Sequence, residues 1–79
     1  MSMRLFLVRH GLSSFNKKGL IQGRIDESYL TDEGYNQAKL TGNILNEIKF
    51  DQIYSSPLKR ASETAREIEK CFKENFDIY

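Results

Sequence analysis

The sequence predicts an α/β fold in which strands and helices alternate around a parallel central sheet. Two observations support this class. Short runs typical of strands occur at residues 3–8 and 52–55, and a longer stretch with helical periodicity follows each of them. A strand, a helix and a second strand in this order imply a parallel pair joined by a right-handed crossover. The expected series is therefore β-α-β-α.

Residues 3–8 are expected to form a central strand. The segment from Leu5 to Val8 is continuously apolar, a pattern typical of a strand that is covered on both faces. Residues 9–30 are rich in glycine, serine, asparagine and charged side chains, which predicts a long loop. A stretch of about 20 residues without regular structure is uncommon inside a compact domain, and it is usually functional or disordered. We therefore interpret residues 9–30 as a functional loop.

The first helix is expected to begin at Thr31, whose hydroxyl can cap the free amides of the first turn. Asp32 and Glu33 follow it, and their charges are favourable at the positive end of the helix dipole. One side of this helix is apolar at helical spacing and is expected to pack on the sheet. Its members are Ala38, Leu40, Thr41, Ile44, Leu45 and Ile48.

The second helix is expected to begin at Ser56-Pro57 and to end at about Lys73. Serine is a good cap, and proline fits the first helical position, where its missing amide costs nothing. An apolar stripe at helical spacing supports the assignment, and its members are Leu58, Ala61, Thr64, Ala65, Ile68 and Phe72. Phe76, Ile78 and Tyr79 resemble the approach to another strand.

The composition excludes several classes of protein. With 39% hydrophobic and 29% charged residues among 79, the chain resembles an ordinary soluble protein and forms one domain at most. The formal net charge is +1 and no basic stripe is evident, so nucleic acid is not expected as a partner. No apolar run approaches the roughly 20 residues needed to cross a bilayer. Cys71 is the sole cysteine and no signal-peptide pattern is present, so a reducing, cytoplasmic setting is expected.

The residues that could bind a ligand or carry out a reaction lie at one predicted edge of the sheet. Arg9-His10-Gly11 follows the first strand, and Arg60 lies in the first turn of the helix after the second strand. In an open parallel sheet, ligands bind beyond the carboxyl ends of the strands. Arginine forks match phosphate oxygens, and a helix amino terminus favours negative charge. These residues predict an anion site with one imidazole in it, suited to a phosphate ester.

Simpler explanations remain open for these charged residues. Arg9 and Arg60 could be ordinary solvated charges or ion-pair partners of Asp26 and Asp51. The two lysines at 17–18 are either a solvated pair or a feature that steers an anionic substrate.

A set of motifs in order carries a resemblance to a known family. The motifs are Leu7-Val8-Arg9-His10-Gly11 with Asn16, Gln22-Gly23, Leu30-Thr31-Asp32-Glu33-Gly34 with Gln37-Ala38, and Ser55-Ser56-Pro57-Leu58-Lys59-Arg60-Ala61 with Thr64-Ala65. Together they resemble the successive signatures of the histidine phosphatase, or phosphoglycerate mutase-like, superfamily. The resemblance implies a three-layer fold with a parallel central sheet. Residues 1–79 would be the amino-terminal portion of one such domain, expected to be incomplete.

The resemblance also implies roles for individual residues. His10 would attack phosphorus and become transiently phosphorylated. Arg9 and Arg60 would neutralise the phosphoryl oxygens, and Asn16 would touch the same group. Three positions match places that line the substrate mouth, namely Ser13, Gln22 and Gly23. The implied partner is a small phosphorylated substrate, with no metal and no organic cofactor.

The sequence departs from the family pattern at several points. Leu12 stands where members usually have glutamate, and Phe15 stands where they often have tryptophan. Members also supply a second histidine and, beyond the second helix, an acid that protonates the leaving oxygen. The chain contains one histidine, and its candidate acids Glu67, Glu69 and Glu74 lie on or at the end of the second helix. We therefore expect the 79 residues alone to be inactive and open to oligomerisation or exchange of elements between chains.

Three functions remain open from the sequence. The first is phosphate-ester hydrolysis through a phosphohistidine on His10, impaired in this short chain. The second is a phosphoglycerate mutase, which returns the phosphoryl group to another hydroxyl of the same acid. The third is a noncatalytic remnant that binds phosphate or a partner protein with the same loop.

Overall fold

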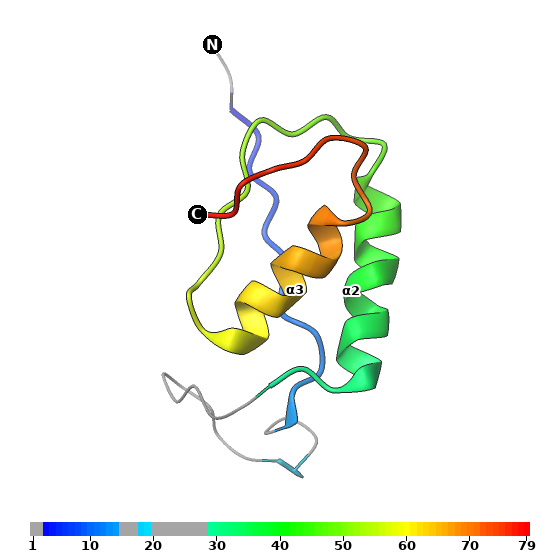
Figure 1. The fold of residues 1–79 in the computed structure, drawn as a ribbon, viewed down its shortest axis with the longest axis vertical. Helices are drawn as coiled ribbons and strands as arrows, with labels where there is room; N and C mark the ends of the chain where they lie inside the picture. Colours follow the sequence, from blue (N-terminus) through cyan, green and yellow to red (C-terminus); the bar gives the residue numbers. More distant parts are fainter. Residues whose placement is uncertain (1–2, 15–17, 20–28) are drawn as a thin grey trace.

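The structure is a computed structural model, and it describes residues 3–14, 18–19 and 29–79. Two helices occur in this part, α2 (Asp32–Leu45) and α3 (Lys59–Glu69). They lie side by side, and the amino-terminal segment passes behind α3 to reach the first turn of α2 (Figure 1). Neither helix is long and apolar enough to cross a membrane.

Helix α2 begins where its sequence predicts. Thr31 is the N-cap, and its hydroxyl oxygen accepts a hydrogen bond from the amide of Gly34 at 3.1 Å. Asp32 and Glu33 occupy the first turn, where their charges oppose the positive end of the helix dipole. This local chemistry needs no tertiary partner, which is why sequence alone predicts the start of α2 correctly.

The buried side of α2 differs from the predicted one. Its buried residues are Gly34, Ala38 and Gly42, which recur every four positions along one face. This small-residue face lies against α3, because a Cβ on Gly42 would stand 3.1 Å from the Cα of Ile68. Leu40 and Ile44, predicted to be covered by a sheet, are 65% and 74% exposed. The prediction was wrong for them because no sheet covers that side among the described residues.

Helix α3 begins and ends inside its predicted bounds. The N-cap is Leu58, which makes no side-chain capping bond. The Ser56 hydroxyl instead accepts from the amide of Leu58 at 3.3 Å, so it closes a turn before the helix. At the other end, the amide of Cys71 donates to the carbonyl of Ile68 at 3.0 Å. This tighter i to i+3 pattern ends α3 at Glu69, before the predicted Lys73.

The predicted sheet is reduced to two isolated bridges among the described residues. Ser13 pairs antiparallel with Leu30, and Ile53 pairs parallel with Ile78. The predicted strand at 52–55 is therefore a one-residue pairing with the carboxy-terminal segment. The prediction of a central strand at 3–8 was wrong, and Leu5 and Leu7, its expected core residues, are 76% and 88% exposed. No described segment offers residues 3–8 the backbone partners that a strand requires.

An aromatic cluster connects the two ends of the chain. The ring of Phe50 lies edge-on to Phe6 at 5.3 Å and stacks on Phe72 at 5.5 Å between centroids. Phe72 also contacts Phe76 at 5.9 Å. Such ring pairs are worth about 0.5–1.5 kcal/mol beyond their area burial. The cluster therefore fixes the segments after α2 and α3 to the amino-terminal segment.

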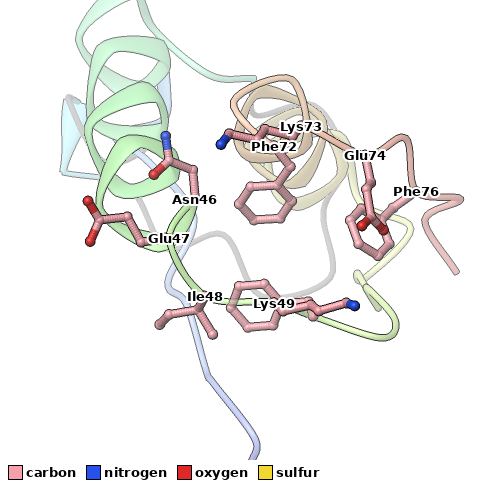
Figure 2. A pocket seen from close by; sticks show the side chains of 9 residues that line it. Asn46, Glu47, Ile48, Lys49, Phe72, Lys73, Glu74 and Phe76 are labelled. Atoms are coloured by element: carbon pink, nitrogen blue, oxygen red, sulfur yellow. The ribbon is translucent and has the colours of Figure 1, made fainter.

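A pocket opens beside the aromatic cluster. It is lined by residues 46–50, which follow α2, and by residues 72–74 and 76, which follow α3 (Figure 2). The ring of Phe72 points into the space between these two segments, while charged side chains such as Glu47 and Lys73 stand around it (Figure 2). This pocket lies at the opposite end of α2 from the residues that the motifs single out.

Candidate active site

His10 directly precedes Gly11, whose backbone contacts both helices. Its ring is half-buried, and its Nδ1 lies 2.7 Å from the carbonyl oxygen of Gly11. A carbonyl oxygen can only accept a hydrogen bond, so Nδ1 carries a proton. In the neutral ring, Nε2 then holds the lone pair. The contact with Gly11 thus selects which nitrogen of the neutral His10 ring keeps its lone pair.

The amide of Gly11 is bound to helix α3. It donates to the hydroxyl of Thr64 at 3.1 Å, and that hydroxyl donates its proton to the carbonyl of Arg60 at 2.6 Å. Thr64 and Arg60 are only 4% and 5% exposed. These two bonds place the residue after His10 directly beside the first turns of α3.

Gly11 also lies against the first turn of α2. A Cβ built on Gly11 would stand 2.9 Å from the Cα of Gly34, and one built on Gly34 would stand 3.0 Å from the amide nitrogen of Leu12. The φ of Gly11 is not positive, so the structure uses this glycine for its close approach to α2.

Leu12 is held by its backbone. Its amide donates to Gln37 Oε1 at 2.7 Å, and its carbonyl accepts from both the amide and the hydroxyl of Thr31, at 3.0 and 2.9 Å. The residue that caps α2 therefore also fixes the loop that carries His10. These bonds involve no side-chain atom of Leu12. A leucine at this position, in place of the glutamate expected from the motif resemblance, therefore leaves them intact.

The following two serines join the loop to the segment before α2. Ser13 is fully buried and forms the antiparallel bridge with Leu30. The amide of Ser14 donates to the carbonyl of Tyr29 at 2.7 Å, and the Ser14 hydroxyl accepts from the amide of Tyr29 at 3.2 Å. Ser13, predicted to line the substrate mouth, is thus a buried residue in the bridge between the loop and the segment before α2.

The structure brings together some of the predicted site residues. Arg60 lies in the first turn of α3 with a buried side chain, whereas Arg9 is exposed. The bonds from Gly11 to Thr64 and from Thr64 to Arg60 make the two motif segments neighbours, as the sheet-edge argument predicts. The predictions for Asn16, Gln22 and Gly23 lie outside the described residues.

A tyrosine and a glutamate join the two helices next to this site. The Tyr35 hydroxyl donates to Glu63 Oε2, while Glu63 Oε1 is buried with no hydrogen-bond partner among the described residues. The hydrogen bond to Glu63, together with burial and the nearby negative charge, raises the pKa of Tyr35 to about 12. Sequence reasoning missed this pair, since neither residue lies in a motif core or on an apolar stripe.

Comparison with known proteins supports the family of the chain. The profile of the histidine phosphatase superfamily (branch 1) matches residues 5–78. The crystal structure of a phosphoserine phosphatase from Entamoeba histolytica, in complex with 3-phosphoglyceric acid, superposes with a TM-score of 0.71. The two sequences are 37% identical over 89% of this chain and 34% of that one.

Two relatives of different activity match similar stretches. A 2,3-bisphosphoglycerate-dependent phosphoglycerate mutase from Thermoplasma acidophilum is 41% identical over 69 residues, which cover 87% of this chain and 34% of the mutase. The fructose-2,6-bisphosphatase TIGAR from Xenopus tropicalis is 38% identical over 74 residues, which cover 94% of this chain and 27% of that protein.

The chain spans about a third or less of the length of the relatives it matches. The solved phosphatase supports the fold of this family for the chain, although the described residues form no sheet. The profile match extends over nearly all of the 79 residues, and the loop that it includes places His10 beside α3. The chain belongs to branch 1 of the histidine phosphatase superfamily.

Proposed function

We propose that His10 accepts a phosphoryl group from a small phosphate ester and passes it to water. The observation that carries this proposal is the bond from His10 Nδ1 to the Gly11 carbonyl at 2.7 Å. It leaves Nε2 as the unprotonated nitrogen of the neutral ring, which is what a nucleophile requires. Family membership supports the reaction class, because relatives of the chain are phosphatases and a phosphoglycerate mutase.

The proposed reaction has two steps. The Nε2 lone pair forms a bond to phosphorus while the bond between phosphorus and the ester oxygen breaks, and the leaving oxygen takes up a proton. Water then attacks the phosphorus, the N–P bond breaks, and its electron pair returns to Nε2; the attacking water releases one proton to the solvent, which balances the proton taken up by the leaving oxygen. The products are the alcohol and inorganic phosphate, and His10 is regenerated.

The remaining predicted residues take supporting roles in this proposal. Arg60 lies at the start of α3, where a guanidinium and the helix amino terminus both favour an anion. Arg9 precedes His10 and is exposed, and in this proposal it would contact the bound phosphate. Asn16 would touch the phosphoryl group. The proposed substrate-mouth residues are Gln22 and Gly23, whereas Ser13 is fully buried and supports the loop through its bridge with Leu30.

Turnover by the 79 residues alone is expected to be slow. General acid catalysis typically contributes about 10²–10⁴-fold, and the candidate acids Glu67, Glu69 and Glu74 lie in the last turn of α3 or after it, whereas the loop with His10 is bound through Thr64 nearer the start of that helix. Formation of phosphohistidine with a good leaving group needs no acid. We therefore expect His10 to be phosphorylated by an activated ester even where complete turnover is weak.

A mutase activity is the second candidate. It would use the same phosphohistidine but transfer the group to a second hydroxyl of the same acid, and the 41% identity to a phosphoglycerate mutase favours it. Incubation with 3-phosphoglycerate separates the two activities. Release of inorganic phosphate indicates hydrolysis, and appearance of the 2-phosphate isomer indicates mutase activity.

The test is to incubate the chain with p-nitrophenyl phosphate and to measure its intact mass at alkaline pH, where phosphohistidine survives. The wild type should gain one phosphate, with one equivalent of nitrophenol released in a burst. His10→Asn should gain none. Equal nitrophenol release by both proteins would overturn the assignment of His10. Binding of inorganic phosphate without any trapped phosphate would favour the noncatalytic phosphate-binding alternative.

A further inference from the structure

The hydroxyl of Thr64 joins two backbone groups from distant parts of the chain. It accepts the amide proton of Gly11, 53 residues earlier, at 3.1 Å, and it donates to the carbonyl of Arg60 at 2.6 Å. A hydroxyl has one proton, and that proton must go to the carbonyl because a carbonyl cannot donate. The direction of both bonds is therefore fixed. Thr64 is 4% exposed, so water does not readily replace either bond.

Gly11 uses both of its backbone polar atoms at this point. Its amide is bound by Thr64, and its carbonyl accepts the Nδ1 proton of His10 at 2.7 Å. Glycine has no side chain to restrict its dihedral angles, so outside contacts must set the direction of that carbonyl. Thr64 supplies one contact, and the backbone of Gly34 limits movement on the other side.

We propose that Thr64 is a positioning residue for the reaction of His10. Its hydroxyl holds Gly11 so that the Gly11 carbonyl retains the Nδ1 proton and leaves Nε2 free. The same hydroxyl ties this arrangement to the backbone of Arg60, so one side chain sets the nucleophile and the start of α3 relative to each other. The catalytic part of this inference rests on the proposed function, whereas the effect on the His10 ring does not.

An ordinary structural role for Thr64 would look different. Serine and threonine in helices often donate to the carbonyl four residues earlier, with no effect outside the helix. Ser62 provides a comparison on the same helix, since its hydroxyl donates to the carbonyl of Lys59 at 3.2 Å in a solvent-exposed hydrogen bond. Only Thr64 adds an acceptor role toward Gly11. The readout that separates the two roles is therefore the state of the His10 ring.

The experiment measures the ¹⁵N shifts of the His10 imidazole by NMR, at a pH where the ring is neutral. The wild type and Thr64→Ser should carry the proton on Nδ1. Thr64→Val, which keeps the shape but lacks the hydroxyl, should show a mixture of tautomers. Exchange of the Gly11 amide with solvent should become about tenfold faster in Thr64→Val, as expected for loss of one hydrogen bond of ordinary strength. Ser62→Ala is the matched control and should leave both readouts unchanged.

Several outcomes would overturn the proposal. A folded Thr64→Val protein with an unchanged His10 tautomer would do so. If Thr64→Val does not fold, the His10 tautomer of the wild-type protein is still a test. A proton found on Nε2 in the wild type contradicts the arrangement directly. Failure of Thr64→Ser to restore the tautomer in a folded protein would also contradict it.

A second measurement, the rate at which His10 is phosphorylated, links the positioning role to the proposed reaction. The rate of His10 phosphorylation by p-nitrophenyl phosphate should fall about tenfold in Thr64→Val and recover in Thr64→Ser. If the tautomer shifts as expected but the wild type traps no phosphate, the proposed function fails and the positioning of the ring stands. If phosphate is trapped at equal rates in all variants, the positioning role fails and the proposed function stands.

Discussion

The backbone of Gly11 packs directly against the backbone of Gly34, with too little space for a methyl group on Gly11, and a methyl group on Gly34 would overlap the backbone of Leu12. This contact brings the loop that carries His10 against the first turn of α2. On its other side, the same loop is bonded to Thr64 of α3. The candidate site is thus a loop held between the starts of two helices.

Replacing Gly34 by alanine should destabilise the protein. The added methyl would overlap the backbone of Leu12, which is fixed by its bonds to Gln37 and Thr31. Overpacking of this kind costs about 1–3 kcal/mol, and chemical denaturation measures it. Asn43→Ala, on the exposed side of α2, is the control and should change the free energy of unfolding by less than about 0.5 kcal/mol. A Gly34→Ala protein as stable as the wild type would contradict the contact.

Thr31→Ala should lower stability by about 1–2 kcal/mol. The substitution removes the cap on the Gly34 amide and one of the two bonds to the Leu12 carbonyl. Thr31→Ser keeps the hydroxyl and should retain most of the stability. Thermal unfolding compares the three proteins, and amide exchange at Gly34 shows whether the cap itself is lost. If alanine and serine have the same effect, the hydroxyl bonds do not contribute.

The stability of the protein should fall as pH rises from about 10 to 12. Tyr35 has its pKa raised to about 12 in the folded state by its bond to Glu63, whereas an unfolded tyrosine titrates near 10. In this window the unfolded chain loses the proton that the folded chain keeps, so unfolding becomes easier. The stabilisation is fully present below pH 10.

Two variants test the origin of this pH dependence. Tyr35→Phe should remove the Tyr35 contribution altogether. Glu63→Gln removes the negative charge and should bring the Tyr35 pKa back toward its ordinary value. Tyrosinate absorbance follows the titration, and urea unfolding at each pH follows stability. If the slope between pH 10 and 12 is the same in wild type and Tyr35→Phe, the pair does not contribute to it.

Substitutions at Leu12 should separate backbone from side-chain effects. The four backbone polar atoms of Gly11 and Leu12 all have partners. Leu12→Glu keeps all of them and should change stability by less than about 0.5 kcal/mol. Leu12→Pro removes the amide proton that Gln37 accepts and should lower the free energy of unfolding by about 1–3 kcal/mol. Equal stability of the two variants, measured by denaturation, would contradict the role of this amide.

The parts of the fold that depend on local chemistry could be predicted from the sequence. The start of α2 is set by the Thr31 hydroxyl and two acidic residues, all within one turn. The start of α3 was less predictable, because Ser56 can cap either the helix or the turn before it, and it does the latter. The buried side of α2 was mispredicted at Leu40 and Ile44, since periodicity does not reveal which surface covers a helix.

The candidate site was predictable only in part. The proximity of the His10 and Arg60 segments followed from the order of elements, and the bonds through Thr64 agree with it. The partners that hold the loop were missed, because hydrogen bonds between residues far apart in sequence leave no periodic pattern. The motif pairs Gln37-Ala38 and Thr64-Ala65 were the available signal. They marked these positions as part of the family pattern, but they did not indicate that Gln37 and Thr64 bind the backbone of the loop.

The hydrogen bond between Gly11 and Thr64 has a consequence for how the site comes into being. During synthesis the residues around His10 leave the ribosome long before Thr64, which lies 53 residues later. Until α3 has emerged, the Gly11 amide lacks its acceptor, and the carbonyl that orients the imidazole has no fixed direction. Early synthesis therefore yields the imidazole of His10 without a fixed orientation. The ring is oriented only when the later helix docks against the loop.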